Sequence, residues 1–416
     1  MVEQRFCKAK AIGSNPLAGL PRTVPVLLVN QHSYNWGDEA AFLGLLGALS
    51  ARGYRIELIL GNTHAIPDRG CIAASGIPFY PAKVRTGLER WLLSASLLHP
   101  ALWVFSRMST RLRALIRTLK NYPLVVVAPG GNNLAYQDHL YLFVIAAALR
   151  QGSRVIFAGN SFGPSGSGRF DATALQLLTR CRVIAREPES YRHLQHNKIP
   201  CWLSSDPALL LTTAEQRTPQ RAGNYSVFIP NQLWAWHGLF KDQTTREAIG
   251  QLIENIIRSL SRQGRVVLLP QTFPYPNPAE DFSLYSRTFN CDIAEYLTPA
   301  EQIRLISGAK GVVSMRYHAL VFAAIAGQRC FSLCYEQKMT GFHQTIYGQE
   351  GQVSLHAPVV ELSTFQLPAL RDFPFPKATA LSEEIERLKH TYNELFPFTP
   401  SHRHQTKSNN LRSISI

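Results

Sequence analysis

Short apolar runs rich in β-branched residues recur along the chain, and each ends at Gly, Pro, Asn or Ser. Segments with apolar residues at helical spacing lie between these runs. We predict strands at residues 24–30, 124–129, 154–159, 266–270 and 311–314. Continuous apolar runs that alternate with helices are typical of parallel sheets covered on both faces. The pattern therefore predicts an α/β fold.

The first run leads through a polar loop into residues 40–52, AAFLGLLGALSAR, where apolar residues recur at helical spacing. Together they form the opening βα unit of a doubly wound domain. A polar segment, TTAEQRTPQRAGNY, precedes a strand-like VFIP run and predicts a linker between two sheets. We divide the chain into an N-terminal extension (1–23), a first domain (24–211), this linker (212–225), a second domain (226–396) and a disordered basic tail (397–416).

Length and composition agree with two globular domains. The 416 residues exceed what one compact core usually holds, and the hydrophobic share of 45% is that of an ordinary folded protein.

Seven scattered cysteines, mostly in apolar stretches, predict reduced thiols in a cytoplasmic protein. Cys330 and Cys334 share one face of a predicted strand, where core packing is expected and a metal site is not. The first residues contain no apolar run that could serve as a signal peptide.

The net charge of the chain indicates which class of molecule it binds. The chain has 43 Lys and Arg against 28 Asp and Glu, a net charge of +15. Such a field attracts phosphates, carboxylates or anionic surfaces. Zinc-finger spacing and aromatic nucleic-acid motifs are missing, so we do not expect nucleic acid as a partner. A small anionic substrate or a lipid surface fits better.

Residues 91–120 are apolar first and rich in arginine afterwards, and Pro100 interrupts them. The apolar part is shorter than the roughly 20 residues that a transmembrane helix needs. We favour a pair of core-facing helices in the first domain. The alternative is a peripheral anchor at the inner face of the membrane, with Trp91 and Trp103 in lipid and the arginines on anionic headgroups.

Candidate ligand-binding residues follow several predicted strands. In the loop NWGDE, Asn35 or Asp38 can cap the next helix, and Gly37 permits a tight turn or a close approach of backbone to ligand. Open α/β sheets bind ligands at this edge. We therefore count Asn35 and Asp38 among the substrate-binding candidates.

Two further strands end in the glycine-bearing loops PGGNN and GNSFGP. Loops of this kind expose backbone N–H groups that hold anions. The candidates here are Gly130, Gly131, Asn132 and Asn160. Neither loop has the GxGxxG spacing or the Walker lysine, which argues against dinucleotides and ATP.

Arg186 ends another predicted strand, just before a helix start at Pro188. It can face a ligand at the rim of the sheet, or it can pair with Glu187 or Glu189. The residues leave both interpretations open.

The strongest candidate site is GVVSMRYHAL, where a buried strand runs into an apolar helix. In extended backbone Arg316 and His318 would project to one side, so we expect both to face one ligand. A guanidinium can clamp a carboxylate or phosphate, and an imidazole can give or take a proton near neutral pH. The alternative for His318 is a hydrogen bond to a carbonyl at a helix start. After the next strand, Lys338 points to the same edge or into solvent.

Seven segments, read in order, resemble the polysaccharide pyruvyl transferase family over residues 35–342. They are NWGDEAAFLGLL, APGGNN, AGNSFGPS, AREPESYRHL, SSDPALLL, LTPAEQIRLISGAKGVVSMRYHALVFAAIAG and YEQKMTGF. The resemblance implies two Rossmann-like domains that face a cleft, as in the B-type glycosyltransferases. It also implies transfer from phosphoenolpyruvate to a sugar diol, free or lipid-linked, which gives a pyruvate ketal and phosphate without a metal or cofactor.

The resemblance also assigns residues. Arg186 and Arg316 match the donor-binding arginines, His318 matches the general acid, and Asp206 matches a position that we interpret as structural. Asn132 stands where a third glycine is usual, and GNSFGP replaces GQGIGP. The alternatives are a nucleotide-sugar-dependent glycosyltransferase of similar fold and a non-catalytic protein that binds anions or membranes. The sequence leaves the acceptor sugar and the oligomeric state open.

Overall fold

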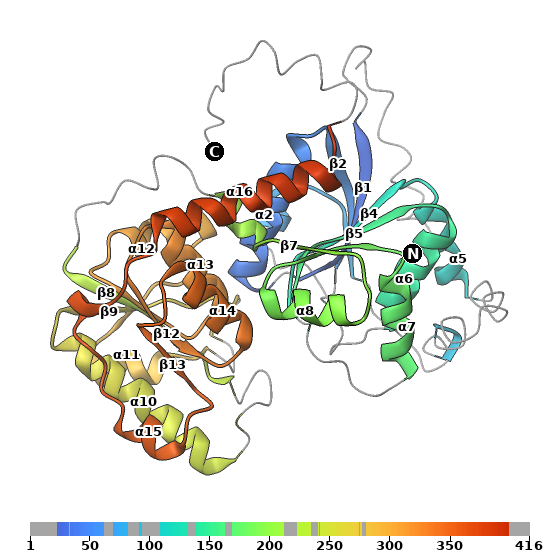
Figure 1. Ribbon diagram of the computed structural model, residues 1–416. Coiled ribbons are helices and arrows are strands. Elements are labelled where there is room, and N and C mark those ends of the chain that lie inside the picture. The colour runs from blue at the N-terminus through green and yellow to red at the C-terminus, as the bar shows by residue number, and fades with distance from the viewer. Residues whose placement is uncertain are drawn as a thin grey trace, which may run out of the picture.

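The protein forms two parallel sheets, each flanked by helices (Figure 1). The computed structural model describes residues 23–32, 34–61, 70–81, 91–93, 109–131, 139–162, 169–211, 223–233, 240, 242–273, 275–276 and 280–398.

The first sheet has seven strands in the order β3-β2-β1-β4-β5-β6-β7, and every neighbouring pair is parallel. Its strands are β1 Val24–Gln31, β2 Tyr54–Gly61, β3 Phe79–Pro81, β4 Leu124–Val127, β5 Arg154–Asn160, β6 Arg182–Ala185 and β7 Cys201–Leu203. Its helices are α2 Trp36–Ser50, α3 Cys71–Ala74, α5 Thr110–Leu119, α6 His139–Arg150, α7 Arg169–Leu178, α8 Pro188–His196 and the 3₁₀ helix η2 Pro207–Leu211. The strand order reverses between β1 and β4, which is where doubly wound sheets open a crevice for ligands.

The second sheet has six parallel strands in the order β10-β9-β8-β11-β12-β13. Its strands are β8 Tyr225–Ile229, β9 Arg265–Leu268, β10 Asp292–Ile293, β11 Val312–Ser314, β12 Cys330–Cys334 and β13 Gln352–Ser354. Its helices are α10 Gln243–Ser261, α11 Ser283–Phe289, α12 Pro299–Ser307, α13 Tyr317–Ile325, α14 Gln337–Ile346, α15 Val359–Thr364, η4 Leu370–Asp372 and α16 Ala378–Leu395.

All five predicted strands are present, and their ends differ from the prediction by at most two residues. The predicted helix at residues 40–52 begins four residues earlier, because the Asn35 side chain accepts a hydrogen bond from the Gly37 N–H at 2.8 Å. Asn35 is therefore the cap, and Asp38 lies in the first turn. In β12 both Cys330 and Cys334 are buried free thiols, as core packing predicts.

The loop before α2 also ties the first sheet to the second. The Trp36 N–H donates to the Gln271 carbonyl at 2.8 Å, and the Phe273 N–H donates to the Tyr34 carbonyl at 3.0 Å. Asn35 and Thr272 form an antiparallel bridge between these bonds. The NWG segment thus pairs with the segment that follows β9.

Helix α16 crosses back from the second sheet to the first (Figure 1, red). The Tyr392 hydroxyl donates to the Ala158 carbonyl at 3.3 Å, and Arg154 donates to the Leu395 carbonyl at 2.8 Å. The helix assigned from sequence to the second domain therefore ends against β5.

Only residues 91–93 and 109–120 of the arginine-rich stretch lie within the described part of the chain. In α5, Leu112 and Leu119 are fully buried while Arg113 and Arg117 are exposed. Helix α5 therefore faces the core, as we favoured from sequence, whereas most of the other helix of the predicted pair lies outside the described residues. Among the described residues, no helix has the length and apolar character needed to cross a membrane.

Candidate active site

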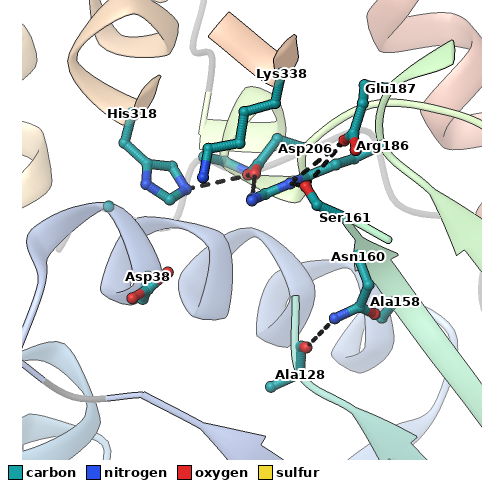
Figure 2. Close-up of polar contacts among 12 residues, drawn as sticks. Asp38, Ala128, Ala158, Asn160, Ser161, Arg186, Glu187, Asp206, His318 and Lys338 are labelled. Atoms are coloured by element: carbon teal, nitrogen blue, oxygen red, sulfur yellow. Dashed lines mark hydrogen bonds and ion pairs between the residues drawn. The ribbon is translucent and has the colours of Figure 1, made fainter. Parts of the chain in front are cut away.

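Strand ends from both domains meet around one buried carboxylate (Figure 2). Arg186 follows β6, Asp206 lies between β7 and η2, and His318 lies in the first turn of α13. The site is therefore complete only when the two domains are together.

Arg186 is held by several buried partners. Its Nη1 donates to Asp206 Oδ2 at 2.6 Å, and its Nε donates to the Ser161 hydroxyl at 2.8 Å. Glu187 Oε2 lies 3.9 Å from the same Nε. The sequence left open whether Arg186 faces a ligand or pairs with Glu187 or Glu189. In the structure it does pair with Glu187, but its closest carboxylate is that of Asp206. Charge-assisted bonds of this kind fix the plane of the guanidinium.

Asp206 is fully buried and lies between Arg186 of the first domain and His318 of the second. Its Oδ1 accepts from the Ala208 N–H at 2.9 Å, while its Oδ2 lies 3.4 Å from His318 Nε2. Burial alone would raise the pKa of Asp206, but His318 and Arg186 outweigh it and hold this pKa well below its usual range. Asp206 thus holds Arg186 and lies beside His318, and the interpretation of this position in SSDPALLL as structural stays a prediction.

His318 rests directly on the backbone of α2. A Cβ added to Gly37 would lie 2.0 Å from His318 Nδ1, far inside contact distance. We predicted that Gly37 permits a tight turn or lets backbone approach a ligand. In the structure it lets the imidazole of the second domain approach the first.

Two cations lie close to the aromatic ring of Tyr317. The Arg186 guanidinium carbon lies 4.7 Å from the ring centroid, and Lys338 Nζ lies 6.0 Å from it. Lys338 also pairs with Glu336, and Figure 2 shows its amine pointing toward Asp206 and His318. The sequence left open whether Lys338 lies at this edge or in solvent, and in the structure it lies at the edge of the site.

Arg316 is placed differently from His318. It occupies the extended cap position of α13, with φ −127° and ψ 134°, whereas His318 is already helical. The prediction of extended backbone through both residues is wrong for His318. Arg316 pairs with the fully buried Glu280, whose carboxylate also accepts from the Thr272 N–H at 2.6 Å. Arg316 Nε has no hydrogen-bond partner among the described residues, so it retains a donor for a ligand.

Asn231 is a further polar residue at this edge, and no sequence motif pointed to it. It lies two residues after the end of β8. Strand β8 pairs with β11, and at the end of this pairing the Met315 N–H donates to the Ile229 carbonyl at 2.9 Å. Its side chain is fully buried, yet neither amide atom has a hydrogen-bond partner within the described chain. Buried amides are normally satisfied, so Asn231 is a candidate for ligand contact.

The two glycine loops bind each other. The Asn160 amide donates to the Ala128 carbonyl at 2.7 Å, and the Ser161 N–H donates to the Gly130 carbonyl at 3.1 Å. The Phe162 N–H donates to Ser190 Oγ at 2.6 Å. The prediction of free backbone donors is therefore wrong for Ser161 and Phe162.

The structure shows no hydrogen bond or ion pair between the Arg186 cluster and the remaining substrate-binding candidates that it describes. Gly131 is half-buried next to this loop pair, and Asn132 lies outside the described residues. Asp38 sits on α2, and no interaction drawn in Figure 2 joins it to the Arg186 cluster. Among the residues that the structure describes, no three His, Cys, Asp or Glu side chains gather as a metal site.

Comparison with known proteins gives a family match. The family model described as polysaccharide pyruvyl transferase matches residues 35–336. A search of curated proteins returns no match.

The fold resembles several solved structures. A UDP-GlcNAc 2-epimerase from Methanocaldococcus jannaschii is 9% identical, with a TM-score of 0.50 over 88% of this chain and 100% of that one. Arabidopsis thaliana UGT89C1 complexed with UDP is 11% identical, with a TM-score of 0.50 over 90% and 98% of the two chains. At such identities the likeness shows the fold alone, which is that of the B-type glycosyltransferases with two Rossmann-like domains.

Proposed function

The chain belongs to the polysaccharide pyruvyl transferase family, and on that premise we propose that it uses phosphoenolpyruvate as the donor. The acceptor is a sugar diol of a surface or secreted polysaccharide, or of its lipid-linked precursor. The product is a pyruvate ketal, and phosphate is released. The observation that supports this proposal most is that Asp206 contacts both Arg186 and His318, an anion binder and a proton donor.

The cations of the site suit the anionic donor. Arg186 and Arg316 are each 5% exposed and are oriented by buried carboxylates, so little reorganisation is needed when the donor binds. Lys338 adds a third positive charge at the edge. We assign these residues to the carboxylate and phosphate of phosphoenolpyruvate, with Asn231 as an additional polar contact.

His318 is the proposed general acid. It gives its proton to the methylene carbon C3 of the donor, which leaves positive charge at C2. The carboxylate of Asp206, 3.4 Å from Nε2, orients the imidazole for this step. General acid catalysis of this kind is worth about 10²–10⁴-fold in rate.

Two acceptor hydroxyls complete the reaction. The first attacks C2 and returns a proton to His318. The second attacks C2 as the C2–O bond to phosphate breaks, and its proton leaves with the phosphate. Protons and charges balance without an oxidant or reductant, so the proposed reaction needs no metal or organic cofactor.

The place of the acceptor is part of the same proposal. A lipid-linked acceptor at the inner face of the membrane would account for the net charge of +15. Membrane contact through residues 91–120 stays a prediction, because residues 94–108 lie outside the described chain.

Phosphate release tests the proposal. Purified protein is incubated with phosphoenolpyruvate and galactose-, glucose- or mannose-type acceptors, wild type beside His318→Ala. We expect release that requires both an acceptor and His318. Thermal stabilisation by a nucleoside diphosphate and not by phosphoenolpyruvate would favour the nucleotide-sugar glycosyltransferase, whose fold this chain shares. Normal turnover by a folded His318→Ala variant would refute the acid step.

A further inference from the structure

A groove of about 390 Å³ lies between α8 of the first domain and α14 of the second. Its volume falls in the range of about 300–1,000 Å³ that is typical of small-ligand sites. Glu187 lines the groove and lies 3.9 Å from Arg186 Nε, so the groove adjoins the site described above. In Figure 1 the two helices face each other across the domain interface.

The groove walls are polar, and their three charged side chains, Glu187, Glu189 and Arg192, leave one net negative charge. Helix α8 contributes Glu189 and Arg192, three residues apart on one helical face, and their charges offset each other. Helix α14 contributes Gln337, Thr340 and Gln344 at helical spacing. Both glutamines are exposed, and neither side-chain amide is hydrogen-bonded to a described residue. Each amide therefore offers two donors and an acceptor to a ligand.

We propose that this groove binds neutral sugar residues of the acceptor glycan next to the diol that is modified. This inference rests on the proposed function. Neighbouring sugar hydroxyls both donate and accept hydrogen bonds, which matches side-chain amides and hydroxyls. The anionic donor is better matched by the buried cations Arg186 and Arg316. The two substrates thus occupy adjoining regions of different polarity.

Gly341 provides a way to fill the groove without disturbing the fold. It lies within α14 and lines the groove, and a Cβ added there would meet no atom within 4 Å. Gly250 in α10 has the same open surroundings far from the groove in the sequence. Replacing a glycine inside a helix also improves helix propensity. The two positions form a matched pair.

The experiment compares Gly341→Leu with Gly250→Leu. We expect Gly341→Leu to raise the KM for an oligosaccharide acceptor about tenfold or more, with thermal stabilisation by phosphoenolpyruvate unchanged. Gly250→Leu should match wild type in both. Saturation-transfer NMR with neutral galactose- or glucose-containing oligosaccharides gives a readout that does not require turnover, and the signals should weaken in Gly341→Leu and in Gln337→Ala/Gln344→Ala.

The outcomes separate the two proposals. Wild-type acceptor KM and undiminished oligosaccharide signals in Gly341→Leu would overturn the groove assignment while leaving pyruvyl transfer intact. The groove assignment also fails if wild-type protein gives no signal with any neutral oligosaccharide. Signals that are lost in Gly341→Leu, without phosphate release or stabilisation by phosphoenolpyruvate in wild type, would support the groove and refute pyruvyl transfer.

Discussion

His318 of the second domain and Asp206 of the first face each other across the domain interface, with Nε2 3.4 Å from Oδ2. The same Oδ2 accepts from Arg186 at 2.6 Å. One buried oxygen therefore connects the proposed acid with the proposed donor-binding cation, and only when the domains are closed. Each of these side chains is oriented by the others.

Asp206→Asn keeps the size of the side chain and removes its charge. We expect kcat/KM to fall about 100-fold, because a buried cation that loses its partner typically costs several kcal/mol. The His318→Ala/Asp206→Asn double variant should be hardly slower than His318→Ala alone, since residues that act as a unit are not additive. Steady-state phosphate release measures both. Full additivity would mean that Asp206 acts independently of His318.

Gly37→Ala tests the contact between α2 and the imidazole. The new methyl group would lie 2.0 Å from His318 Nδ1, so the ring must move. A displacement of about 1 Å in a catalytic group can cost about 100-fold in rate, and we expect a loss of this size in kcat. Gly47→Ala in the same helix is the control, because a Cβ there meets nothing within 4 Å. Equal activity of the two variants would contradict this geometry.

Stability should depend on the ionisation of Asp206 at low pH. Its pKa in the folded protein is held below the unfolded value of about 3.9, chiefly by His318 and Arg186 acting against burial. The ionised carboxylate therefore stabilises the fold above about pH 4, and this contribution is lost as the pH falls toward the folded pKa. Between pH 5 and pH 3, the difference in free energy of unfolding between wild type and Asp206→Asn should shrink by about 1 kcal/mol. Urea denaturation at both pH values measures it, and a constant difference would contradict the pKa direction.

Local signals in the sequence predicted much of the fold. The apolar runs give the strands because each is buried on both faces, as β4 and β11 are. Arg186 and His318 were identified because each follows a strand, and the ends of parallel strands share one edge. These inferences need only neighbouring residues.

Contacts between the domains could not be predicted in the same way. The pairing of Asp206 with His318 joins residues more than a hundred positions apart, and it exists because two separate sheets close on each other. The sequence likewise indicates only a turn at Gly37. In the structure this glycine lies against the side chain of His318 in α13. The sequence also shows nothing of Glu280, whose partner Arg316 lies in another strand-to-helix junction.

Asn231→Leu separates a structural role from a binding role. The wild-type amide is fully buried without a hydrogen-bond partner among the described residues, so an apolar side chain of similar size should leave the free energy of unfolding unchanged or raise it by up to about 1 kcal/mol. If the amide contacts the donor, the KM for phosphoenolpyruvate should rise about tenfold, equivalent to about 1.4 kcal/mol. Urea denaturation and steady-state kinetics measure the two effects. If the amide has a structural role instead, Asn231→Leu should lower the free energy of unfolding and leave the KM for phosphoenolpyruvate unchanged. The two roles therefore predict different changes in both measurements.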